Sequence, residues 1–200
     1  MKHVPVLMNE VIESLQLKPN ANVIDCTLGD GGHAEMILEK TAPEGKLLGI
    51  DADPESLLRA KQNLYRFENR AIFARDNFVN LLKIIEENKF GKADGILMDL
   101  GWSSPQFEER GRGFSFQKDE TLDMRFDPSS GGQTAGEMVN NLSAEELEKI
   151  FREYGEEKLS NQIAQLIIKK RQIKKIETTQ DLAKIAEEAY KYRRGKIHPA

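Results

Sequence analysis

The stretch NVIDCTLGDGGHAE, residues 22–35, decides how the first half of the chain is read. A short apolar run rich in β-branched residues ends at Leu28, and glycines and a histidine follow. Gly29-x-Gly31-x-x-Ala34 fits the glycine pattern that joins the first strand of many nucleotide-binding folds to a helix. Such a junction offers a ligand the N-terminal end of a helix. The alternative is a tight strand-to-helix turn in which the glycines only allow close packing.

Strand and helix patterns alternate through the first hundred residues. We expect strands over residues 22–28, 46–53, 70–76 and 93–101. We expect helices over residues 6–17, 33–41, 54–67 and 77–89. This alternation indicates an α/β fold with a parallel sheet, and right-handed crossovers give the strand order 3-2-1-4 of a Rossmann-like domain.

The second half of the chain differs in composition and pattern. Residues 101–132 are rich in Gly, Ser and Pro, and helical patterns follow, beginning with a capping box at Ser143 and Glu146. We expect the first part of the α/β domain over 1–105, a loop or lid over 106–132, and a helical substrate-recognition domain over 133–200. An apolar strand at a sheet edge is normally covered. We therefore expect that the remaining strands lie beyond residue 200.

Composition narrows the class of protein. Charged residues make up 31% of the 200 residues, and no apolar run is long enough to span a membrane. The single cysteine, Cys26, and the absence of a secretory signal pattern favour a reduced, cytoplasmic setting. Scattered histidines and one cysteine show no metal-ligand spacing. Residues 169–200 hold 10 basic and 4 acidic side chains, which suits either a phosphate-bearing partner or a solvated helix face.

Asp51 points to a ribose-bearing cofactor. It ends the second expected strand, 20 residues after Gly31, where a carboxylate can accept hydrogen bonds from both ribose hydroxyls. The other use of such a residue, capping the next helix, is already served by Asp53. The acidic residues Asp30 and Glu35 disfavour a pyrophosphate and tolerate the ammonium and sulfonium charges of S-adenosylmethionine (SAM). These features alone do not separate SAM from NAD.

Polar and aromatic residues also follow the third and fourth strands. Asp76, Asn77 and Phe78 lie where an adenine would bind, although Phe78 equally suits the core of the next helix. Asp99 ends the fourth strand, where it can accept a hydrogen bond from a target amino group or simply form a turn. For His33, at the start of a helix, we expect a positioning role rather than proton transfer.

Three segments have the composition of RNA contacts. ERGRGFSF (109–116) and LDMRFD (122–127) mix arginine with phenylalanine, which suits phosphate contact and base stacking, or else a folded loop with buried rings. KKRQIKK (169–175) suits a phosphate backbone, or else an ordinary helix terminus.

Several motifs occur together in one order: HVPVLMNEV, DCTLGDGGH, GILMDLGWSSPQ, RGFSF, LDMRFDP, YGEE and KIHPA. In this the chain resembles the bacterial small-subunit ribosomal RNA cytosine-N4-methyltransferase family, of the MraW type, over nearly all 200 residues. The resemblance implies a SAM-binding Rossmann-like domain, interrupted after its fourth strand by a helical domain and completed by later sequence. Trp102 is a bulky residue at the variable position of DLGxSSPQ.

The resemblance also implies a function and a site. The expected function is a SAM-dependent methyltransferase that modifies the exocyclic N4 of a cytidine in small-subunit ribosomal RNA, with the ribosomal RNA or the ribosomal subunit as partner. Asp99 is the expected catalytic residue, orienting the target amine. The expected cofactor-binding residues are Gly31, Gly32, His33, Asp51, Phe78, Asp99 and Gln106. The alternatives are an NAD-dependent oxidoreductase and a non-catalytic RNA-binding fragment.

Overall fold

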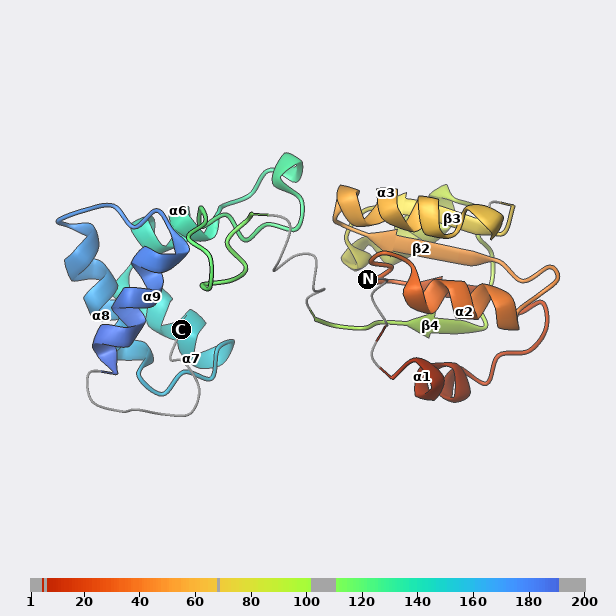
Figure 1. The fold of residues 1–200 in the computed structure, drawn as a ribbon, viewed down its shortest axis with the longest axis horizontal. Coiled ribbons are helices and arrows are strands. Elements are labelled where there is room, and N and C mark those ends of the chain that lie inside the picture. The colour runs from red at the N-terminus through yellow and green to blue at the C-terminus, as the bar shows by residue number, and fades with distance from the viewer. Residues whose placement is uncertain (1–4, 6, 68, 102–110, 191–200) are drawn as a thin grey trace. The chain divides into compact units, whose positions relative to one another are not determined.

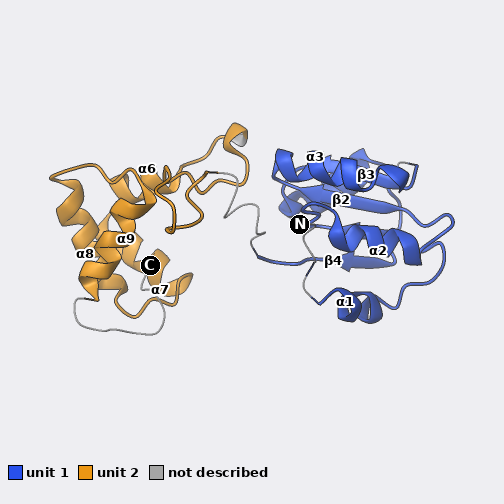
Figure 2. Cartoon of the chain, viewed as in Figure 1, with its two compact units in different colours: residues 1–101 blue, residues 102–200 orange. Residues whose placement is uncertain are grey.

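The structure is a computed structural model that describes residues 5, 7–67, 69–101 and 111–190. The chain forms two compact units, residues 1–101 and 102–200, and each is described by itself (Figure 2). No helix in the described part of the chain is long and apolar enough to cross a membrane.

Unit 1 contains a four-stranded parallel sheet (Figure 1). Its strands are β1 (Val23–Asp25), β2 (Leu47–Asp51), β3 (Ala71–Arg75) and β4 (Gly95–Leu97). The order β3-β2-β1-β4 confirms the predicted 3-2-1-4 arrangement. All four strands are shorter than the sequence pattern suggested. The parallel direction brings the carboxyl ends of all four strands to one edge of the sheet.

Helices cover the sheet on both faces. They are α1 (Met8–Leu15), α2 (Gly32–Lys40), α3 (Pro54–Asn63) and α4 (Leu81–Glu87), with short 3-10 turns at Tyr65–Phe67 and Phe78–Asn80. One core joins α1, α2 and α3 to the side chains of Val23 and Leu47, and these two strand residues are fully buried. The opposite core joins α4 to Ile24 and Leu48. This alternation of side chains between the two faces follows from the two-residue period of a strand.

Strand β4 lies at the edge of the sheet among the described residues, next to β1 alone. Ile96 and Met98 are 49% and 45% exposed, although both are large apolar residues. Within the described residues of unit 1, β4 is therefore an edge strand with exposed apolar side chains.

Unit 2 is helical. Its helices are α6 (Ala135–Asn141), α7 (Ala144–Glu153), α8 (Ser160–Arg171) and α9 (Thr179–Ala189), after a 3-10 turn at Pro128–Ser130. The predicted capping box of Ser143 and Glu146 is confirmed, and Thr134 and Glu137 form a second one at the start of α6. The core of this unit contains Leu122, Val139, Leu147, Ile163, Ala164, Ile167, Ile176 and Ile185.

The segment that precedes these helices is folded onto them. A backbone bridge pairs Thr121 with Thr178, and the hydroxyl of Thr179 donates a hydrogen bond to the carbonyl of Lys118 at 2.6 Å. Phe114 is 8% exposed and its ring lies 5.5 Å from that of Phe126. Residues 111–134 therefore belong to the packed structure of unit 2.

Candidate functional site

The glycine loop leaves β1 and enters α2 through two left-handed residues. Gly29 has φ +53° and Gly31 has φ +88°. A Cβ on Gly31 would also lie 3.0 Å from a methyl carbon of Leu64, so both conformation and space favour glycine. The first intrahelical bond runs from the N–H of Glu35 to the carbonyl of Gly31. Gly32 and His33 thus form the amino-terminal turn of the helix, which is the end that attracts negative ligand groups.

Asp51 is tied directly to this loop. One carboxylate oxygen accepts a hydrogen bond from the N–H of Gly29 at 2.8 Å, and the other accepts one from the N–H of Asp53 at 2.8 Å. Asp53 caps α3 through the N–H of Glu55, as its place before a proline predicts. The carboxylate of Asp51 is therefore fixed in orientation at the edge of the glycine loop.

Asp99 lies two residues beyond β4 and faces the same loop. A carboxylate oxygen lies 3.8 Å from Nε2 of His33, and the side chain of Asp99 is 57% exposed against 9% for His33. The exposed carboxylate can reach a ligand, whereas the histidine is held inside the wall of the loop. This arrangement suits the positioning role expected for His33.

Asp25 and Thr27 are two residues of this edge that sequence reasoning left out. Asp25 is 1% exposed, and burial, partly offset by a backbone hydrogen bond from Thr27, raises its pKa to about 7. The nearby carboxylates of Asp51 and Asp99 contribute to this rise. The available signal was an aspartate that ends an apolar strand, by the same reasoning that singled out Asp51 and Asp99.

The charges around the loop differ from the sequence-based expectation. Asp30 lies 3.7 Å from the guanidinium of Arg59, and Glu35 lies 3.1 Å from that of Arg66. These arginines offset the two carboxylates on which the argument against a pyrophosphate was based. The negative charge of the site comes instead from the residues that follow the strands, chiefly Asp51 and Asp99.

The residues after β3 have mainly local contacts. Asp76 accepts hydrogen bonds from the N–H of Asn77 and the amide of Asn80, which hold its pKa below the usual range. Asn77 caps the turn that contains Phe78. Phe78 is partly buried against the core that includes Ile84, so its ring has the core position considered as its alternative role. Two other expected residues, Trp102 and Gln106, lie outside the described residues.

Three arginines among the described residues of unit 2 bond to their own unit. Arg112 donates to the carbonyl of Phe126 at 2.6 Å, and Arg125 makes paired hydrogen bonds of 2.7 Å with the carboxylate of Asp123. Arg171 donates to the carbonyls at the end of α6, on Val139 and Leu142. These guanidinium groups hold the fold of unit 2 together.

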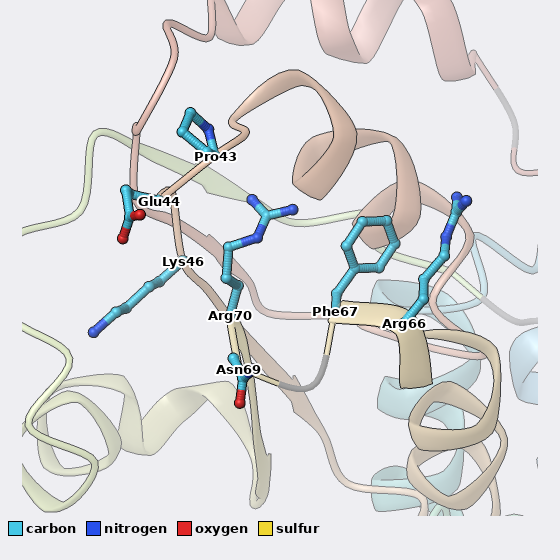
Figure 3. A pocket seen from close by; sticks show the side chains of 7 residues that line it. All are labelled: Pro43, Glu44, Lys46, Arg66, Phe67, Asn69 and Arg70. Carbon is cyan, nitrogen blue, oxygen red and sulfur yellow. The ribbon is translucent and has the colours of Figure 1, made fainter.

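A cavity lies at the opposite end of the sheet from the glycine loop (Figure 3). It is lined by Pro43, Glu44, Lys46, Arg66, Phe67, Asn69 and Arg70, which precede or adjoin the starts of β2 and β3. Arg70 donates to the carbonyls of Gly45 and Leu38 at 3.0 and 2.8 Å, and Arg66 binds Glu35 and Glu39. These contacts indicate a structural role for the two arginines, so we place the candidate site at the carboxyl edge.

Comparison with known proteins supports the resemblance seen in the sequence. A model described as the MraW methylase family matches residues 1–200. The chain is 46% identical over 201 residues to "Ribosomal RNA small subunit methyltransferase H" of Clostridium botulinum strain 657, covering 100% of this chain and 64% of that protein. It is 42% identical to the protein of that name from Symbiobacterium thermophilum, covering 99% of this chain and 63% of that protein.

A crystal structure described as a putative rRNA-methylase from Clostridium thermocellum aligns with 40% of this chain and 46% of that one, at 16% identity and a TM-score of 0.36. That likeness is too slight to support an argument, and the fold assignment comes from the strand order instead. The chain spans about 64% of the length of the Clostridium botulinum relative. Because the family model matches from the first residue to the last, the chain belongs to the MraW methylase family.

Proposed function

We propose that the protein acts as a SAM-dependent methyltransferase on the exocyclic N4 of a cytidine in small-subunit ribosomal RNA, in the cytoplasm. The observation that carries this proposal is the gathering of Asp25, Asp51 and Asp99 around a glycine loop in a chain of a methylase family. Carboxylates in such an arrangement favour a ligand that carries positive charge. A pyrophosphate would meet these carboxylates at close range, and this counts against the NAD-dependent alternative.

The residues of the loop fit this cofactor. Asp51, held at the glycine loop by the N–H groups of Gly29 and Asp53, would accept hydrogen bonds from the ribose hydroxyls. The backbone at Gly31 and Gly32, with His33, would hold the amino-acid end at the start of α2. Phe78, whose ring is only partly buried against the core, and Gln106 are the remaining proposed contacts. When bound, SAM supplies an electrophilic methyl group to the target nitrogen.

Asp99 is the residue that we propose contacts the target base. Its exposed carboxylate would accept a hydrogen bond from the exocyclic amino group and orient the nitrogen lone pair. Holding two reacting groups in one geometry is a large source of rate enhancement. A base must leave its stack to reach such a site, as in other enzymes that modify bases.

Methyl transfer to ribosomal subunits tests this function. Small subunits from a strain that lacks the modification are incubated with the full-length protein and SAM labelled in its methyl group. We expect label in N4-methylcytidine after digestion, and label in any other nucleoside would contradict the N4 assignment. Asp99→Ala should abolish the transfer. Asp119→Ala, which removes an exposed carboxylate from unit 2, is the matched control and should leave it unchanged.

Calorimetry separates the remaining alternatives. The protein should bind SAM and not NADH, and binding of NADH alone would point to an oxidoreductase. Ribosomal RNA binding with no affinity for SAM would point to an RNA-binding module.

A further inference from the structure

Thr27 links the glycine loop to the proposed catalytic carboxylate. Its Oγ1 accepts a hydrogen bond from the backbone N–H of Asp99 at 2.8 Å. Its own N–H donates to the carboxylate of Asp25 at 3.1 Å. Thr27 therefore stands between the buried end of β1 and the segment that follows β4.

This hydrogen bond holds a part of the backbone that lies beyond the hydrogen bonds of the sheet. The paired residues of β1 and β4 end at Asp25 and Leu97, and one further backbone bond runs from Cys26 to the carbonyl of Leu97. Asp99 lies two residues past that point, at an exposed edge where Leu100 is 71% exposed. The ladder therefore does not fix the backbone of Asp99, whereas the hydroxyl of Thr27 ties it to β1.

The base of this link is buried. Asp25 is 1% exposed, and its carboxylate accepts the hydrogen bond from the N–H of Thr27. This bond ties the backbone of Thr27 to the buried end of β1. The hydroxyl of Thr27 is thus held next to the strand end, where it accepts the hydrogen bond from Asp99.

We propose that Thr27 is a positioning residue for methyl transfer: its hydroxyl holds the backbone of Asp99 so that the carboxylate faces the glycine loop beside His33. This inference rests on the proposed role of Asp99 in orienting the target amine. A hydroxyl at this position is needed, and its β-methyl group is not. The alternative is a purely structural role, in which Thr27 only closes the turn after β1.

Two substitutions of Thr27 test the proposal in the full-length protein. Thr27→Val keeps the shape and removes the hydroxyl, and we expect kcat to fall about tenfold while KM for SAM changes less than about twofold. Thr27→Ser restores the hydroxyl, and kcat should return to within about threefold of the original. Thr41→Val is the matched control, because it removes a buried hydroxyl that donates to the carbonyl of Ile37 in the same unit. It should destabilise unit 1 and leave kcat unchanged.

Amide exchange at Asp99 provides a readout that does not depend on activity. By NMR, the N–H of Asp99 should exchange about tenfold faster in Thr27→Val than in the original protein or in Thr27→Ser. Unchanged exchange or unchanged kcat in Thr27→Val, or a serine variant as impaired as the valine one, would overturn the proposal. If the original protein transfers no methyl group, the proposed function fails, and the exchange rates still report whether the Thr27–Asp99 bond exists.

Discussion

The two units use charged side chains in opposite ways. In unit 1, the carboxylates at the strand ends lie close together around a glycine loop, and Asp25 has its pKa raised to about 7 as a result of burial and this proximity. In unit 2, Arg112, Arg125 and Arg171 bond to carbonyls and a carboxylate of their own unit. Like charges held together at a cost to stability indicate a binding site. Charged groups that are bonded to carbonyls and carboxylates of their own unit indicate a structural role.

Removal of the Asp51 side chain should cause the largest loss of function, measured as affinity for SAM. Asp51→Ala removes the expected ribose contacts and the anchor of Gly29, so we expect SAM affinity to fall by about a hundredfold or more. Isothermal calorimetry measures this change. Asp119→Ala in unit 2 should bind SAM as the original protein does, and a loss of similar size in both variants would remove the distinction between the units.

Neutralising Asp25 should stabilise unit 1 in a pH-dependent way. The pKa of Asp25 is about 7 in the folded protein and 3.8 as its usual value. The folded state therefore binds a proton at Asp25 more tightly than the unfolded state does. Stability associated with this group is present at low pH and is lost as the pH rises from about 4 to about 7. Asp25→Asn keeps an acceptor for Thr27, so at about pH 8 it should be more stable by about 4 kcal/mol. Urea unfolding at about pH 8 and about pH 5 measures this, and an equal difference at both values would contradict it.

Arg171 tests the structural side of the comparison. Arg171→Met removes two hydrogen bonds to the last carbonyls of α6 and should lower the free energy of unfolding by about 2 kcal/mol. Urea unfolding followed by circular dichroism measures it. Lys169→Met, on the exposed side of the same helix, should change stability by less than about 0.5 kcal/mol. Weaker RNA binding by Arg171→Met at unchanged stability would instead make Arg171 an RNA contact.

The smallest expected effect concerns the backbone of the glycine loop. Gly31→Ala places a Cβ at φ +88° and 3.0 Å from Leu64, which should lower the stability by about 1–2 kcal/mol. Gly111→Ala, at φ +62° with nothing within 4 Å, shares the unfavourable conformation without the contact. Comparing the thermal midpoints of the two variants isolates the close packing of the loop against α3. Equal midpoints would show that conformation alone requires glycine at position 31.

Much of the fold could be predicted because it depends on local patterns. Buried strands alternating with amphipathic helices, and the right-handed rule for crossovers, were enough for the order β3-β2-β1-β4. The cap at Asp53 and the capping box of Ser143 and Glu146 follow from residues three or fewer apart. Because parallel strands share a carboxyl edge, the sequence also placed Asp51 and Asp99 at one edge of the sheet.

Tertiary structure decided which polar side chains remain available to a ligand. Sequence could not show that Arg59 and Arg66 offset Asp30 and Glu35, because the arginines come from a later segment, α3 and the 3-10 turn that follows it. Nor could it show that Thr27 reaches Asp99, a residue 72 positions away. The sequence by itself determined the order of elements and the chemical character of the site. The ion pairs around the site and the hydrogen bond that holds Asp99 join residues that are far apart in the sequence. Only the tertiary structure decided them, since hydrogen bonds and ion pairs depend on distance in space.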